Sequence, residues 1–129
     1  MKIDNDFYEI VIAYNALTDA SFLSSVIDYL EPHYFKNDDI RRIVDVTVDY
    51  YKKRDEVPTL TELKSYLTTP ELKDSYKSTV ALFSDFDQKF NKDELYENTE
   101  RFLKEKAVYH TLLEVADSAT DENLDTNIV

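Results

Sequence analysis

Glycine is absent from this chain of 129 residues, and that absence removes two large classes of nucleotide-binding site. A P-loop needs glycines so that backbone N–H groups can wrap phosphates, and a dinucleotide fingerprint needs them for close approach to pyrophosphate. Gly and Pro also supply most tight hairpin turns, and the chain has only three Pro. The composition therefore favours an all-α fold, and the length suits one domain with its own core.

Cysteine and long apolar runs are absent as well. Without Cys the chain has neither a disulfide nor a thiolate metal site. No apolar stretch approaches the roughly 20 residues that span a bilayer, and the N-terminus lacks a signal-peptide pattern. These features favour an intracellular protein without a membrane partner.

Positive charge is scarce, because 27 acidic and 15 basic residues give a formal net charge of −12. Lys and Arg that neutralise phosphates provide most nucleic-acid affinity, so we expect no direct binding to nucleic acid. The basic residues occur in short runs, which are either solvated helix faces or a docking site for an acidic partner. The candidate docking residues are Arg41, Arg42, Lys52, Lys53 and Arg54.

Apolar residues recur at helical spacing in six segments, which predicts six α-helices. Capping residues mark three of the starts: Asn37, the pair Thr59 and Glu62 of a capping box, and Thr69 before Pro70. The first three helices are expected over about residues 5–17, 19–30 and 37–54. The fourth and fifth are expected to begin after Thr59 and at Pro70, and the sixth to cover about residues 91–118.

The apolar stripes of these helices predict the buried core, with a corner after Pro32 that plugs it. Ten Tyr and seven Phe fall mostly on the stripes, so core packing explains them better than base stacking does. Tyr50, Tyr96 and Tyr109 are expected to be partly exposed, as Tyr residues at interfaces often are. The candidate core residues are Phe7, Val11, Leu30, Phe35, Ile43, Leu63, Leu67 and Phe83.

The sixth helix is longer than a small globule needs, about 40 Å at a rise of 1.5 Å per residue. Its second half is apolar over most of its circumference, which requires neighbours on more than one side. It either folds back on the globule or protrudes and pairs with another chain, and we favour the second. We expect a globular part over residues 1–90, this long helix over 91–118 and a frayed polar tail over 119–129. The candidate self-association residues are Leu103, Val108, Tyr109, Leu112, Leu113, Val115 and Ala116.

Residues for catalysis or metal binding do not form a recognisable set. His33 and His110 are the only histidines, and neither has a partner at metal-ligand spacing. Asp45 and Asp49 share a helix face, but such pairs are usually solvated. We therefore predict no catalytic, metal or cofactor-binding residue, so that this chain is not itself an enzyme. A small enzyme with an unrecognised carboxylate site is a weaker alternative.

The order and spacing of three segments resemble a known family. Residues 30–35 form a Leu-x-Pro-x-x-Phe corner, an amphipathic helix follows over 37–54, and Val57-Pro58-Thr59 to Leu63 opens a short helix. The arrangement is similar to the N-terminal domain of replicative hexameric helicases of the DnaB family, in the form found in T-even-like bacteriophages. Residues 7–23 and 96–116 are similar to other helices of that domain, which extends the resemblance over most of 5–118. That family often has Gly before the Val-Pro entry, whereas this chain has Arg54, Asp55 and Glu56, so the turn must differ.

The resemblance implies a collar and docking platform in DNA replication rather than a site of chemistry. It implies a homo-oligomer, with a dimer of this domain and a hexamer of the parent protein, and docking of primase and of a helicase loader. The parent would use ATP and Mg²⁺ in an ATPase domain outside this chain, in the cytoplasm of a bacterial host. Under this interpretation the chain is a truncated piece that stops where the second helix of a hairpin would start. The rival hypothesis is a free-standing acidic helical adaptor, such as an inhibitor that mimics DNA by its charge.

Overall fold

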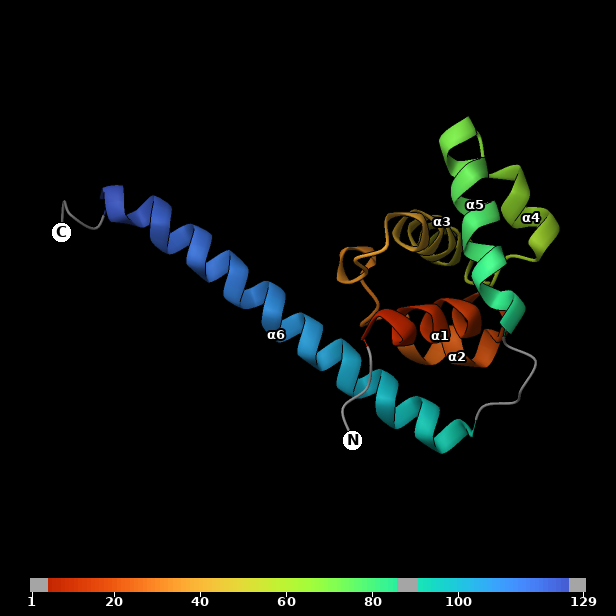
Figure 1. The fold of residues 1–129 in the computed structure, drawn as a ribbon, viewed down its shortest axis with the longest axis horizontal. Helices are drawn as coiled ribbons and strands as arrows, with labels where there is room; N and C mark the ends of the chain where they lie inside the picture. Colours follow the sequence, from red (N-terminus) through yellow and green to blue (C-terminus); the bar gives the residue numbers. More distant parts are fainter. Residues whose placement is uncertain (1–4, 86–90, 126–129) are drawn as a thin grey trace.

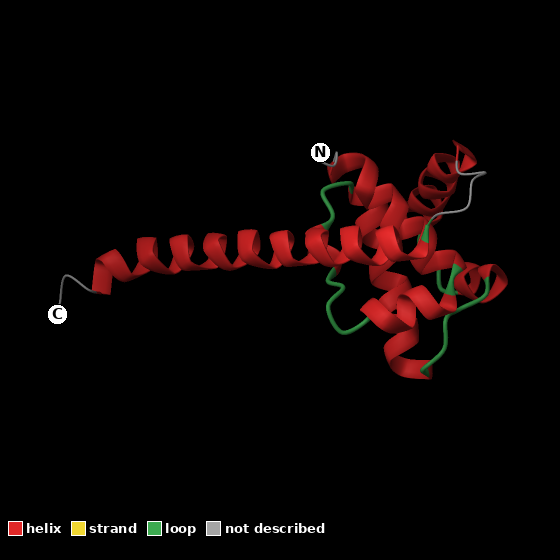
Figure 2. Ribbon diagram, turned by 90° about the horizontal axis from the view of Figure 1, so that it is seen from below, coloured by secondary structure: helices red, strands yellow, loops and turns green. Residues whose placement is uncertain are grey.

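The computed structural model describes residues 5–85 and 91–125, and within these residues the regular elements are all helical (Figure 1). The predicted all-α fold is confirmed. Figure 2 shows the same helices without a strand in the described part of the chain. The elements are α1 (Asn5–Thr18), α2 (Ala20–Val26), η1 (Pro32–Tyr34), α3 (Asp38–Arg54), α4 (Leu60–Ser65), α5 (Pro70–Leu82), η2 (Phe83–Asp85) and α6 (Lys92–Asp125).

Helices α1 to α5 form a globule, and α6 lies along one side of it before projecting far beyond it (Figures 1 and 2). The main core cluster joins α1, α2, α3 and the first half of α6, and a smaller cluster joins α1, α3 and α4. α1 contributes to both clusters, so it ties the two halves of the globule together. The core residues that the sequence predicted and the structure buries are Val11, Leu30, Phe35, Ile43, Leu63 and Leu67.

The corner before α3 is held by a buried carboxylate that the sequence did not reveal. Glu9 of α1 is only 1% exposed, and its Oε1 accepts backbone hydrogen bonds from Lys36 at 3.0 Å and Asn37 at 3.1 Å. The negative charge also lies near the N-terminal end of α3, where the helix dipole favours it. Asn37 then caps α3, its side chain accepting from the backbone N–H groups of Asp39 and Ile40.

The turn after α3 shows how the chain manages without glycine. Asp55 adopts φ 57° and ψ 27°, the left-handed conformation that Gly usually takes just after a helix. Its backbone N–H donates to the Tyr51 carbonyl and closes the last turn. Asp is one of the few other residues that tolerates this conformation, since its short polar side chain bonds locally. Asp55 therefore takes the place that Gly usually has at the end of such a helix.

The short helix α4 begins with the predicted capping box. The Thr59 hydroxyl accepts from the Glu62 N–H, and the Glu62 carboxylate accepts from the Thr59 N–H at 3.0 Å. The same carboxylate accepts a hydrogen bond from the Tyr50 hydroxyl at 2.8 Å, which ties α3 to α4. These hydrogen bonds lower the pKa of Glu62. Tyr50 is 6% exposed, so the expectation that it is partly exposed was wrong.

Several predicted positions differ from the structure. Phe7 was predicted to be in the core but is 51% exposed, because α1 turns its neighbour Tyr8 inward instead. Phe83 is partly buried at the edge of the core, where its ring packs against Tyr14 with centroids 5.3 Å apart. α2 ends at Val26, four residues earlier than expected at Leu30, and a turn covers the difference.

α6 is also longer than predicted, since it continues to Asp125 and not only to about residue 118. At a rise of 1.5 Å per residue, its 34 residues span about 50 Å. The predicted tail over 119–129 is therefore helical as far as residue 125, and residues 126–129 lie outside the described part of the chain.

Candidate functional site

The first half of α6 is fixed to the globule by polar as well as apolar contacts. The Asn91 side chain caps the helix by accepting from the backbone N–H of Glu94 at 3.0 Å. The Tyr8 hydroxyl of α1 donates to the Leu95 carbonyl at 3.0 Å and lies 3.1 Å from the Thr99 hydroxyl. These contacts set the rotation of α6 about its axis. They therefore set the direction in which the projecting half presents its side chains.

An apolar strip covers the projecting half of α6, and we define it as Val108, Tyr109, Leu112, Leu113, Val115 and Ala116. Its five larger side chains are between 43% exposed, for Leu113, and 61% exposed, for Leu112. Figure 1 shows that α6 leaves the globule along this part of the helix. A cluster of large apolar side chains with this exposure usually marks an interaction surface.

Leu113 continues the face of α6 that contacts the globule, but the rest of the apolar strip turns away from that face. Successive helical residues are rotated by roughly 100°, which gives each side chain a direction around the axis. The buried residues of the first half, Leu95, Thr99, Phe102, Leu103 and Lys106, share one direction. The centre of the strip lies roughly 110° from that direction on the same scale. The globule therefore cannot cover the whole strip by a small bend of α6.

Leu103 does not belong to this surface, which corrects the predicted set. It is 6% exposed and lies in the main core cluster with Phe102. The reason is its position on the helix, which points it toward α2 and the turn that follows. The other six predicted residues are all exposed and follow one another on one side of α6.

Four rings meet where α6 leaves the globule. His33 and Tyr34 of η1 approach His110 of α6, with centroid distances of 4.7 Å and 5.5 Å, and Tyr109 packs edge-on against His110 at 5.4 Å. Burial lowers the pKa of His110, and the neighbouring His33 and Lys106 lower it further, whereas Glu114 opposes them. His110 is therefore favoured in its neutral form beside the apolar strip.

We expect His110 to titrate below the ordinary value of 6.5. Because the folded-state pKa lies below the unfolded value, this group's contribution to stability is fully present above the unfolded pKa and is lost as pH falls from the unfolded pKa through the folded pKa. An NMR pH titration of the ring protons measures the midpoint. His33→Asn should raise the midpoint of His110, because it removes a nearby positive charge. Lys52→Gln removes a distant charge and should leave the midpoint unchanged. A wild-type midpoint at or above 6.5 would contradict the assignment.

The candidate docking cations do not form one basic patch. Arg41 and Arg42 lie in the first turns of α3, and Lys52, Lys53 and Arg54 lie at its other end. Arg41 pairs with Asp38, Arg42 pairs with Glu71 at 2.9 Å, and Lys53 pairs with Asp49 at 3.1 Å. Much of their charge is thus opposed locally by carboxylates.

We therefore expect no measurable binding of this domain to single-stranded or double-stranded DNA near physiological salt. The physical reason is the net charge of −12 together with these local ion pairs, which leave few cations to neutralise phosphates. Fluorescence anisotropy with a labelled oligonucleotide measures binding. Micromolar affinity that falls steeply with added salt, and that Lys52→Gln with Lys53→Gln abolishes, would show a phosphate-contacting surface and contradict the expectation.

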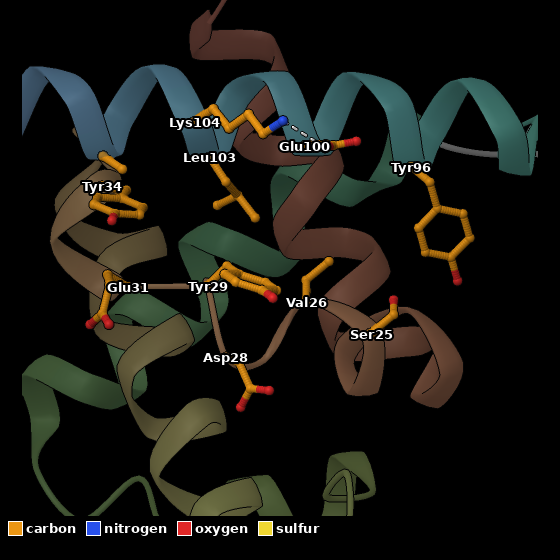
Figure 3. A pocket seen from close by; sticks show the side chains of 11 residues that line it. Ser25, Val26, Asp28, Tyr29, Glu31, Tyr34, Tyr96, Glu100, Leu103 and Lys104 are labelled. Atoms are coloured by element: carbon orange, nitrogen blue, oxygen red, sulfur yellow. Dashed lines mark ion pairs between the residues drawn. The ribbon is translucent and has the colours of Figure 1, made fainter.

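A cavity of about 560 Å³ lies on the other flank of α6, between its first half and the turn after α2 (Figure 3). Val26 and Tyr29 lie opposite Leu103 in this view, and Tyr34 and Tyr96 stand at the two ends. The cavity is mainly apolar, with acidic side chains at its margin. We call it the α2–α6 pocket; its lining is Ser25, Val26, Asp28, Tyr29, Glu31, Tyr34, Tyr96, Glu100, Leu103, Lys104 and Ala107.

Sequence reasoning missed the α2–α6 pocket, because segments about 70 residues apart form it. One signal was present in the sequence. Tyr29 falls off the apolar stripe of its segment, and the structure leaves it 68% exposed. A large aromatic residue off the stripe, next to a Pro corner, is a reasonable marker of a surface site. Its counterpart on α6 depends on the rotation of that helix, which the sequence alone does not give.

Comparison of the chain with family models, with curated proteins and with solved structures found no match. Among the described residues, no group of three or more His, Cys, Asp or Glu side chains is placed to hold a metal ion. The helices in the described part of the chain include none that is both long and apolar enough to cross a bilayer. The candidate functional surfaces are thus the apolar strip and the α2–α6 pocket.

Proposed function

We propose that this chain is the N-terminal collar and docking domain of a phage replicative DNA helicase of the DnaB family. In this role it pairs with neighbouring subunits of a hexamer and presents a surface to primase and to a helicase loader. The observation that carries the proposal is the apolar strip on a helix that projects from the globule. The order of the corner, α3 and the entry to α4 supports it, since that order resembles the family.

Self-association through the strip follows from its geometry. Val108, Leu112 and Val115 point away from the chain's own core, so another chain has to cover this part of the strip. A second copy offers the same strip, and symmetric pairing of identical surfaces is the commonest form of protein oligomer. The end of α6 beyond Glu114 carries Asp117, Asp121 and Asp125 without a Lys or Arg. An antiparallel pair separates the two acidic ends, whereas a parallel pair places them side by side.

The rival proposal, an acidic adaptor that mimics DNA, has less support because it does not explain the apolar strip. Such a protein works by presenting carboxylates to a basic groove. It has no need of five large apolar side chains on a projecting helix. The gene separates the two proposals directly. A reading frame that continues into Gly-x-x-x-x-Gly-Lys-Ser/Thr supports the helicase, in which ATP and Mg²⁺ act in the adjoining ATPase domain, and a frame without that motif supports the adaptor.

The oligomeric state tests the collar role of the domain itself. Sedimentation velocity from low micromolar to near-millimolar concentration should show a reversible monomer–dimer equilibrium. The two outcomes are distinct, because a dimer has twice the monomer mass of 15.2 kDa. A chain that remains monomeric throughout this range, with α6 packed on its own globule, would remove the collar mechanism.

A further inference from the structure

The α2–α6 pocket has the dimensions and lining of a binding site for part of another molecule. Its volume of about 560 Å³ falls within the range of small-ligand pockets, about 300–1,000 Å³. Val26 and Leu103, which are 7% and 6% exposed, form the apolar floor of the pocket. Tyr29, which is 68% exposed, forms one wall. Exposed Tyr beside a buried apolar floor is a common composition for the centre of a protein interface.

The margin of the pocket is acidic. Asp28 and Glu31 lie on the turn between α2 and η1, and Figure 3 shows both at the outer edge, away from α6. On the α6 side the Lys104 ammonium pairs with the Glu100 carboxylate at 2.8 Å, so the one cation among the described lining residues is already opposed. Glu31 and Glu114 also raise the pKa of Tyr34, after the larger effect of its burial. The unpaired charges at the margin of the pocket are therefore acidic, at Asp28 and Glu31.

Charge and position exclude two occupants. Nucleic acid is excluded because its phosphates would meet Asp28, Glu31 and Glu100. The projecting end of a second copy is disfavoured, because its sequence beyond Lys106 is acidic and has no Lys or Arg. The pocket and the apolar strip lie on opposite flanks of α6. Around the helix axis, the pocket lies roughly 100° to one side of the globule-facing direction, and the centre of the strip lies roughly 110° to the other side. A dimer formed through the strip therefore leaves the pocket open.

We propose that the α2–α6 pocket is the docking site for a short peptide segment of a partner protein that carries an apolar anchor flanked by Lys or Arg. The anchor lies on Val26 and Leu103 against the Tyr29 ring, and the flanking cations lie beside Asp28 and Glu31. This inference deepens the docking role proposed above and rests on it, while self-association through the strip is independent of it.

Three short synthetic peptides test the chemistry of the site: Lys-Lys-Leu-Phe-Lys-Lys, Glu-Glu-Leu-Phe-Glu-Glu and Lys-Lys-Ser-Ser-Lys-Lys. NMR titration of the wild-type domain should show amide shifts concentrated at Tyr29, Leu103 and Ala107 with the first peptide. The other two should bind at least tenfold more weakly, since each lacks either the cations or the anchor. Equal binding of the acidic peptide, or of the serine peptide, would overturn the proposal, as would shifts that lie elsewhere.

Matched variants separate the pocket from the strip. Tyr29→Ala and Asp28→Lys should each weaken binding of the first peptide severalfold, and about tenfold or more together. Phe7→Ala and Asp45→Lys are the controls, because they remove an exposed aromatic ring and reverse an exposed charge outside both the pocket and the apolar strip. Sedimentation of Tyr29→Ala should match the wild type. Loss of peptide binding in the controls would overturn the site, whereas loss of self-association in Tyr29→Ala would show that a second copy occupies the pocket.

Discussion

Replacing Phe35 with Ala should lower the free energy of unfolding by about 3–5 kcal/mol, the usual effect of removing a buried Phe. Phe35 is 1% exposed, and its ring lies 6.0 Å from that of Phe102 in α6. It plugs the corner between η1 and α3, where α1, α3 and α6 meet. Removing the ring opens a cavity that no neighbouring backbone can fill, so the loss exceeds the transfer term alone.

Leu63→Ala should cost about 2–5 kcal/mol by the same mechanism in the smaller cluster, where Leu63 packs with Leu17, Ile43 and Leu67. Urea unfolding gives both values, and Phe7→Ala is the matched control because Phe7 is 51% exposed. We expect that control to change the free energy by about 1 kcal/mol or less. The assignment of inside and outside would be wrong if Phe7→Ala destabilised the domain more than Phe35→Ala.

The helices and their ends were predictable because local signals set them. Asn37, the Thr59 and Glu62 pair, and Thr69 before Pro70 each cap a helix in the structure as their side-chain chemistry requires. Such signals act within a single turn of chain, so they do not depend on the rest of the fold. The type of each element and the first residue of most helices could therefore be predicted from the sequence.

The buried face of α1 was not predictable in the same way. Nearly every residue from Phe7 to Ala13 is apolar, so the periodicity does not select one face. In the structure Glu9 accepts hydrogen bonds from the corner at Lys36 and Asn37, and this contact helps to rotate Tyr8 inward and Phe7 outward. The buried face of α1 is thus tied to contacts with residues far along the chain, and the local apolar pattern does not reveal them.

The apolar strip was predictable and the α2–α6 pocket was not, for a related reason. An excess of apolar residues in one helix is visible in the sequence, whatever the helix packs against. The direction of Leu103, toward the core and not toward the strip, depends on how Tyr8 holds Leu95 and Thr99. The pocket depends on that same rotation and on the turn after α2.

Replacing Leu112 and Leu113 together with Lys should convert the domain from a dimer into a folded monomer. Burying a Leu contributes about 1.5–3 kcal/mol, and a symmetric interface contains two from each copy. Even if the four side chains are only partly buried, the substitution should reduce the free energy of dimerisation by about 3 kcal/mol or more. That reduction raises the dissociation constant roughly a hundredfold. Sedimentation velocity of both proteins, at matched concentrations, measures the change.

Thr111→Lys with Ser118→Lys provides the control, because it adds the same two charges to the same helix at exposed positions roughly 115–135° from the centre of the strip. This variant should dimerise like the wild type. Circular dichroism and urea unfolding should show all the proteins folded, since neither Leu112 nor Leu113 belongs to a core cluster. If both lysine pairs weaken the dimer equally, general charge on α6 governs association and the apolar strip does not. If neither does, the copies meet through another surface, and the projecting helix has to be assigned to a different partner.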